Sequence, residues 1–119
     1  MSTTAIIIVA VFMTGMGVLA IASPTRFLRF VGSETLGREG RNEVRAVYGG
    51  FGLMMGGILL YALQQTDYRP GILLCMGLAL AGMSLGRVVS IALDRAMTPM
   101  IVGVAIGEMV GGSVLILAI

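Results

Sequence analysis

The chain has 119 residues, of which 57% are hydrophobic and 12% charged, and its formal net charge is +2. A soluble domain of this size could not bury so large an apolar fraction, so the composition predicts an integral membrane protein in contact with the lipid bilayer. The positive charge is a small excess of arginine rather than a basic surface, so nucleic acid is not expected as a partner.

Four apolar stretches occupy most of the chain: residues 4–22, 43–64, 70–94 and 98–119. A bilayer core of about 30 Å is crossed by about 20 helical residues, so each stretch is predicted to be a transmembrane helix. The expected fold class is all-α, a polytopic membrane protein with a four-transmembrane-helix bundle that forms a single domain over residues 1–119.

The connections carry recognisable signals for helix starts. After the first helix, Pro24 is expected to open a short interfacial helix within the loop 24–41. The apolar side chains of this short helix are predicted to face lipid: Phe27, Leu28 and Phe30. Asn42 is the expected N-cap of the second helix, and Thr98 followed by Pro99 predicts the start of the fourth.

The arginines are distributed unequally between the two ends of the predicted helices. Those that flank the first and third connections are Arg26, Arg29, Arg38, Arg41, Arg45 and Arg95. Only Arg69 lies at the opposite end. Because basic residues remain in the cytoplasm, this bias predicts a multi-pass protein of the inner membrane with the loop 24–41 inside and both termini outside.

Glycines at four-residue spacing predict close packing between the helices. Small residues let helix backbones approach, and close packing holds membrane helices together where no hydrophobic driving force acts between them. The glycines expected at these contacts are Gly52, Gly56, Gly82, Gly86, Gly103, Gly107 and Gly111. A glycine-lined pore is the alternative interpretation.

Arg87 and Glu108 are charges in the middle of predicted membrane helices. Each would cost about 2.5–3.5 kcal/mol in lipid, which disfavours a lipid-facing position. The two residues lie at similar depth on helices joined by a tight turn, and side chains lean toward the N-terminus of their own helix. We therefore predict that Arg87 and Glu108 meet on adjacent, antiparallel helices.

Further polar residues accompany this pair. Ser90 and Asp94 lie at helical spacing from Arg87 on the third helix, and the second helix contributes Glu43, Arg45 and Tyr48. Two interpretations remain open. The polar residues form either a structural ion-pair network or a pocket open to the cytoplasm that binds a ligand or a proton.

Three sequence elements resemble one known family. They are Glu43-Val-Arg45-Ala-Val-Tyr48-Gly49-Gly50, Arg87-Val-Val-Ser90-Ile-Ala-Leu-Asp94 and the late Glu108. With them the chain resembles, over its whole length, the domain of unknown function family 4345, which comprises small bacterial four-helix membrane proteins. The family pattern often has glycine where this chain has Arg95. The resemblance implies the topology and a bacterial membrane, but no activity.

The residue inventory favours a protein that is not an enzyme. The chain has no histidine and a single cysteine, so nucleophilic and metal constellations are missing from the sequence and no metal or other cofactor is expected. The predicted function is a small scaffold or binding protein. Its expected partners are a lipid headgroup, another membrane protein or a second copy of the chain. The alternative is a proton-coupled transporter of a small solute that uses Glu108.

Overall fold

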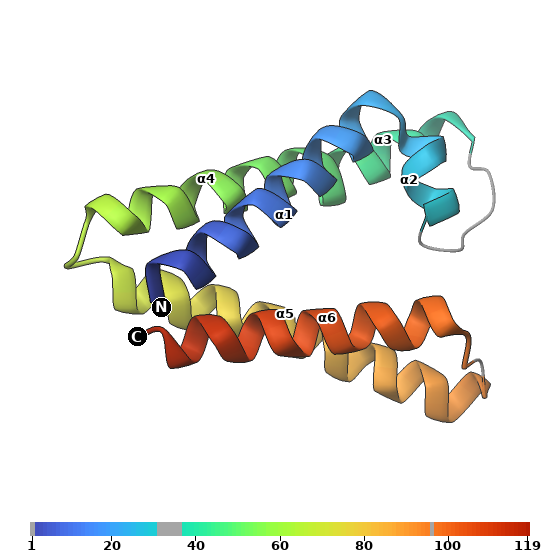
Figure 1. Ribbon diagram of the computed structural model, residues 1–119. Coiled ribbons are helices and arrows are strands. Elements are labelled where there is room, and N and C mark those ends of the chain that lie inside the picture. Colours follow the sequence, from blue (N-terminus) through green and yellow to red (C-terminus); the bar gives the residue numbers. More distant parts are fainter. Residues whose placement is uncertain (1, 31–36, 96) are drawn as a thin grey trace. The chain divides into compact units, whose positions relative to one another are not determined.

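The computed structural model describes residues 2–30, 37–95 and 97–119, and all of its regular structure is helical (Figure 1). The elements are α1 (Ser2–Ala22), α2 (Pro24–Phe30), α3 (Arg38–Val44), the π-helix η1 (Arg45–Gly50), α4 (Phe51–Gln64), α5 (Arg69–Asp94) and α6 (Pro99–Leu117). No strand occurs within these three ranges. The predicted all-α class is therefore confirmed.

Within the described residues, four helices are long and apolar enough to cross a membrane. They are Ser2–Ala22, Arg38–Gln64, Arg69–Asp94 and Pro99–Leu117, with 21, 27, 26 and 19 residues. The second of these is continuous through α3, η1 and α4. At 1.5 Å per residue each helix is long enough to span a bilayer core of about 30 Å, which is compatible with a multi-pass membrane protein.

The helix starts differ from the prediction at one position. The second long helix begins at Arg38 with Gly37 as its N-cap, so Asn42 lies inside α3 and its expected role as N-cap is wrong. Polar residues can continue a helix beyond the apolar segment, and Glu39 in the first turn stabilises the earlier start. Of the expected polar loop, residues 31–36 lie outside the described residues.

The start of α6 follows the prediction. The Thr98 hydroxyl accepts a hydrogen bond from the Ile101 backbone N–H at 3.3 Å, and Pro99 occupies the first turn. At the preceding helix end, Arg95 is the C-cap of α5 and has a left-handed φ of 53°. Glycine adopts this conformation at the lowest cost, so a glycine at position 95 would fit the same helix end.

The helices form two compact units. One is Ile7–Tyr61, and the other comprises Met1–Ile6 and Ala62–Ile119. We refer to them as the Ile7–Tyr61 unit and the Ala62–Ile119 unit. The expected single domain over residues 1–119 stays a prediction.

In the Ile7–Tyr61 unit, α1 packs on η1 and α4 through glycines of both helices. A Cβ on Gly52 would lie 3.1 Å from the Met13 carbonyl oxygen, and one on Gly56 would lie 3.0 Å from that of Ala10. From α1, a Cβ on Gly17 would lie 2.8 Å from the Leu53 nitrogen. Gly52 and Gly56 thus lie at a helix contact, and any larger residue there would separate the backbones.

The short helix α2 packs inward rather than toward lipid. Its Phe27 and Leu28 are 1% and 6% exposed and form a buried cluster with Ala20 and Val44. The prediction that these two side chains face lipid is therefore wrong, while Phe30 is exposed. The apolar face of α2 is already used against α1 and α3, whose ends lie beside it.

In the Ala62–Ile119 unit, α5 and α6 form an antiparallel hairpin. Its closest approach lies at Gly77 and Gly112, where a Cβ on Gly112 would be 2.6 Å from the Gly77 carbonyl oxygen. Farther along the same face, the buried Ser84 hydroxyl donates to the Ala105 carbonyl oxygen at 2.7 Å. Small residues on both helices make this contact possible.

The glycines predicted to pack α5 and α6 against neighbouring helices do not lie in the contact between these two helices. A Cβ on any of four of them would meet nothing within 4 Å: Gly82, Gly86, Gly103 and Gly107. Gly111 lies at the edge, with the Leu80 side chain 3.6 Å from its Cβ position. Gly82 and Gly86 are each two residues from Ser84, about 200° around the helix. They therefore lie on the opposite face from the contact.

Arg69 caps the C-terminal end of α4. Its Nε donates to the Ala62 carbonyl oxygen and its Nη2 to that of Leu63, both at 2.8 Å. The last carbonyls of a helix have no partner within the helix, and a cation is stabilised at this negative end. Arg69 is thus part of the turn between α4 and α5.

Candidate functional site

Arg87 of α5 and Glu108 of α6 form a bidentate ion pair. The Arg87 Nε lies 2.7 Å from Oε2 of Glu108, and Nη2 lies 2.8 Å from Oε1. The two side chains are 30% and 11% exposed. Two parallel charge-assisted hydrogen bonds fix both the distance and the orientation of the partners. The contact that the sequence predicted is therefore confirmed.

The packing of the hairpin brings the two charges together. Ser84 precedes Arg87 by three residues on α5, and Ala105 precedes Glu108 by three on α6, so each pair shares a helix face. The hydrogen bond from Ser84 to Ala105 holds the helices close between the positions of Arg87 and Glu108. Because the residues on this face are small, α5 and α6 lie close enough for the Arg87 guanidinium and the Glu108 carboxylate to contact each other directly.

A shallow hollow lies beside the ion pair. It has a volume of about 320 Å³ and is lined by Met83, Gly86, Arg87, Ser90 and Ile101. The side chain of Gly86 is a single hydrogen, which leaves room next to the guanidinium. The hollow therefore combines a cation and a hydroxyl with apolar walls.

Asp94 lies one turn beyond this hollow. The Ser90 hydroxyl donates to the Asp94 Oδ2 at 3.2 Å, and both residues are exposed. The polar face predicted on this helix thus contains two linked pairs, one between helices and one within α5.

The other three predicted site residues belong to the Ile7–Tyr61 unit. The Arg45 Nε donates to the Ile21 carbonyl oxygen at 3.0 Å, near the C-terminal end of α1. The Tyr48 ring packs on Phe27, with the centroids 4.9 Å apart and the planes at 42°. Glu43 is exposed. Arg45 and Tyr48 therefore connect the second long helix to α1 and α2.

The π-helix was not predicted, although it coincides with the most specific sequence element. It covers Arg45–Gly50, which is most of the element that begins at Glu43. A Cβ on Gly49 would contact the Ile21 side chain. The sequence Tyr48-Gly49-Gly50 is the feature from which the π-helix could have been predicted, because glycine tolerates a local departure from regular helix geometry. Short π-helical segments often lie at functional sites.

The seven predicted polar residues thus form two groups. Glu43, Arg45 and Tyr48 are in one unit, and Arg87, Ser90, Asp94 and Glu108 are in the other. A single pocket that includes both groups stays a prediction. Across residues 2–30, 37–95 and 97–119, no three carboxylate, cysteine or histidine residues form a group that could hold a metal ion.

Comparisons with known proteins identify a family. The profile of the family described as "Domain of unknown function (DUF4345)" matches residues 1–119. Neither the search of curated proteins nor the search of solved structures returned a match. The match covers the whole chain, including the π-helical element and both charges of the ion pair. The chain therefore belongs to the DUF4345 family.

Proposed function

We propose that this protein is a non-enzymatic membrane scaffold or binding protein. The bidentate contact between Arg87 and Glu108 is the observation that carries the proposal. A charge pair of this geometry couples the two membrane helices and specifies which faces meet, and removal of either partner leaves an uncompensated charge. The pair acts as a structural clamp for the α5–α6 hairpin.

The contacts of the remaining reactive side chains support a role other than catalysis. Glu108 forms an ion pair with Arg87, and Ser90 donates a hydrogen bond to Asp94. The Tyr48 ring packs on Phe27. General acid–base catalysis requires a side chain that is positioned to exchange a proton with a substrate. Glu108, Ser90 and Tyr48 make contacts within the fold instead.

The hollow beside Arg87 is the proposed binding site. The Arg87 guanidinium and the Ser90 hydroxyl oxygen provide polar groups at one wall, and Met83 and Ile101 provide apolar contact. Ligand sites of membrane proteins combine an apolar surface with a few placed polar groups. A lipid headgroup or a polar side chain of a partner helix has the chemistry for this site.

We also propose the bacterial inner membrane as the location, with both termini outside and residues 37–45 in the cytoplasm, from the arginine distribution. Single cysteines at Ser2 and Gly37, both exposed, test this in a Cys75→Ser background. A membrane-impermeant maleimide added to intact spheroplasts is expected to label Ser2→Cys and to leave Gly37→Cys unlabelled until the membrane is opened. Labelling of Gly37→Cys in intact spheroplasts contradicts the orientation.

A proton-coupled transporter is the second candidate function. It is favoured by the position of Glu108, a carboxylate within a helix long enough to cross the membrane. Intramembrane carboxylates mark many proton pathways. Against it, each transport cycle would have to protonate Glu108, break two charge-assisted hydrogen bonds and leave Arg87 without its counter-charge.

A reconstitution experiment separates the two functions. Vesicles that contain wild-type protein are given a pH gradient and a panel of cationic, anionic and zwitterionic solutes, and an internal pH-sensitive dye reports proton flux. We expect no solute-dependent flux from the wild type. Flux that persists in Asp94→Asn and disappears in Glu108→Gln would establish the transporter instead, because Asp94 is an exposed carboxylate on the same hairpin.

A further inference from the structure

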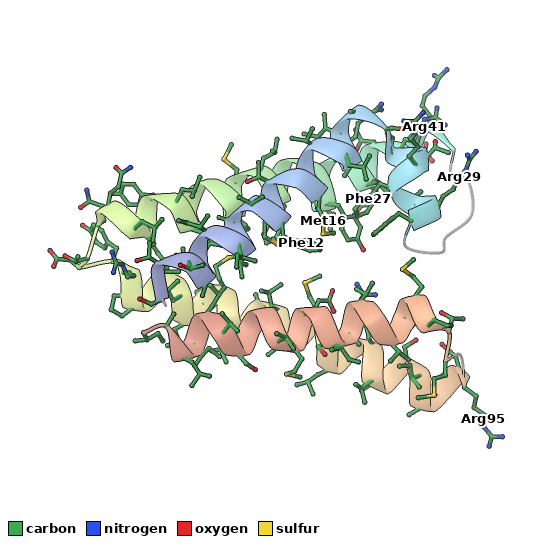
Figure 2. The ribbon with its side chains drawn as sticks, in the orientation of Figure 1. Phe12, Met16, Phe27, Arg29, Arg41 and Arg95 are labelled. Atoms are coloured by element: carbon green, nitrogen blue, oxygen red, sulfur yellow. The ribbon has the colours of Figure 1, made fainter. Side chains whose placement is uncertain are left out.

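A second hollow lies in the Ile7–Tyr61 unit, between α1 and α2. It is an open groove of about 250 Å³ whose lining is apolar. The residues that line it are Val11, Phe12, Gly15, Met16, Leu19, Phe27 and Phe30. Figure 2 shows Phe12 and Met16 of α1 near Phe27 of α2, with Arg29 toward the end of α2.

The groove is held open by its own residues. Phe27 forms its inner wall and is fixed in the buried cluster, so it cannot fold into the groove. Phe12 and Phe30 stand at the rim, 61% and 60% exposed. Gly15 forms part of the floor, and a Cβ there would meet nothing within 4 Å. A larger side chain at Gly15 would therefore occupy the groove without displacing other atoms of the protein.

The length and depth of the groove match one leaflet of a bilayer. Along α1 it extends from Val11 to Leu19, about 12 Å at 1.5 Å per residue. Val11 lies near the middle of α1 (Ser2–Ala22), and Leu19 lies near its end. When α1 crosses the membrane, the groove therefore runs from the bilayer midplane to the interface, which is about 15 Å for one leaflet.

The interfacial end of the groove is positively charged. α2 carries Arg26 and Arg29, which are exposed beside Phe30. The nearby α3 carries Arg38 and Arg41 together with Glu39 and Glu43, so the excess positive charge at this end comes from the two arginines of α2. The groove is apolar, has the length of one leaflet and ends at exposed arginines. This chemistry is complementary to a lipid with an acyl chain and an anionic headgroup.

We propose that this groove binds an anionic phospholipid, with one acyl chain along α1 and the headgroup phosphate at the arginines of α2. The inference goes beyond the proposed function and is independent of the Arg87–Glu108 pair, because it uses a different unit and different residues. It gives α2 a role. The short helix closes one side of a lipid site with its apolar residues and holds the headgroup with its basic ones.

Native mass spectrometry of the purified chain tests the proposal. The protein in detergent is titrated with phosphatidylglycerol and, separately, with phosphatidylcholine, and the first binding constant is measured for each lipid. The wild type is expected to prefer phosphatidylglycerol. Arg29→Gln should weaken binding of phosphatidylglycerol about fivefold, which corresponds to about 1 kcal/mol per arginine near a lipid surface. Gly15→Leu should weaken binding of both lipids because it fills the groove.

Two matched variants control for general effects. Gly57 is also an exposed helical glycine whose Cβ would meet nothing within 4 Å, but it lies on α4 outside the groove. Arg95→Gln removes the same charge from an exposed position in the Ala62–Ile119 unit. Gly57→Leu and Arg95→Gln are expected to bind both lipids like the wild type.

Two outcomes overturn the proposal. Equal losses in Arg29→Gln and Arg95→Gln would show that net charge alone attracts the lipid. Unchanged lipid binding in Gly15→Leu would show that no acyl chain lies in the groove, and a simultaneous loss of thermal stability in that variant would assign the groove to a protein segment. Arg29 is exposed, so Arg29→Gln is expected to fold, and its lipid binding can be measured even if Gly15→Leu fails to fold.

Discussion

Replacing Gly112 with leucine is expected to disrupt the α5–α6 hairpin, whereas replacing Gly107 with leucine should leave it intact. A Cβ on Gly112 would lie 2.6 Å from the Gly77 carbonyl oxygen and 3.2 Å from the Ala81 nitrogen. Both neighbours are backbone atoms of a packed helix and cannot yield as a flexible side chain does. The expected loss in the free energy of unfolding exceeds about 3 kcal/mol, the upper end of the usual cost of overpacking.

Gly107→Leu is the matched control for this change. A Cβ at Gly107 would meet nothing within 4 Å, and leucine has a higher helix propensity than glycine by up to about 1 kcal/mol. Both variants add the same side chain to the same helix. Unfolding in mixed detergent micelles, followed by circular dichroism, measures the difference. Equal losses in the two variants would contradict the helix contact at Gly77 and Gly112.

Removing one charge of the ion pair while keeping the other has the second large expected effect on the free energy of unfolding. Arg87→Met removes the guanidinium that pairs with the Glu108 carboxylate, and Glu108→Gln removes the negative charge that both guanidinium nitrogens bind. Breaking a buried ion pair on one side costs about 3–5 kcal/mol. We expect about 3 kcal/mol for each variant, because Arg87 retains 30% exposure.

The same unfolding assay measures this prediction. Ser90→Ala serves as a control, since it removes an exposed hydroxyl beside the pair while leaving both charges in place. Its expected effect lies within about 0.5 kcal/mol, as for most surface substitutions. A loss in Arg87→Met no larger than that in Ser90→Ala would mean that the ion pair does not stabilise the hairpin.

The features that the sequence predicted correctly depend on strong and local physical terms. Apolar length identifies a membrane helix without knowledge of its neighbours, because the bilayer thickness is fixed. Thr98 and Pro99 act within one turn of α6. Arg87 and Glu108 could be paired from sequence because a lone charge in a membrane helix is costly and only one short turn separates their helices.

The features that the sequence did not predict depend on which faces meet. Four-residue spacing identifies stripes of small residues, but α5 has more than one such stripe, and Gly77 rather than Gly82 or Gly86 lies at the contact. The inward packing of Phe27 likewise depends on Ala20 of α1 and Val44 of α3, which belong to other helices. The π-helix at Arg45–Gly50 is a departure from helical periodicity that no periodicity argument includes.

A double-mutant cycle at Arg87 and Glu108 tests the central claim, that the pair is a structural clamp between α5 and α6. The free energies of unfolding of the wild type, Arg87→Met, Glu108→Gln and the double variant are compared. If the charges stabilise each other, the double variant should recover part of the loss of either single variant, because no uncompensated charge remains. Losses that add within about 0.5 kcal/mol would contradict the clamp, because additivity is the behaviour of independent sites.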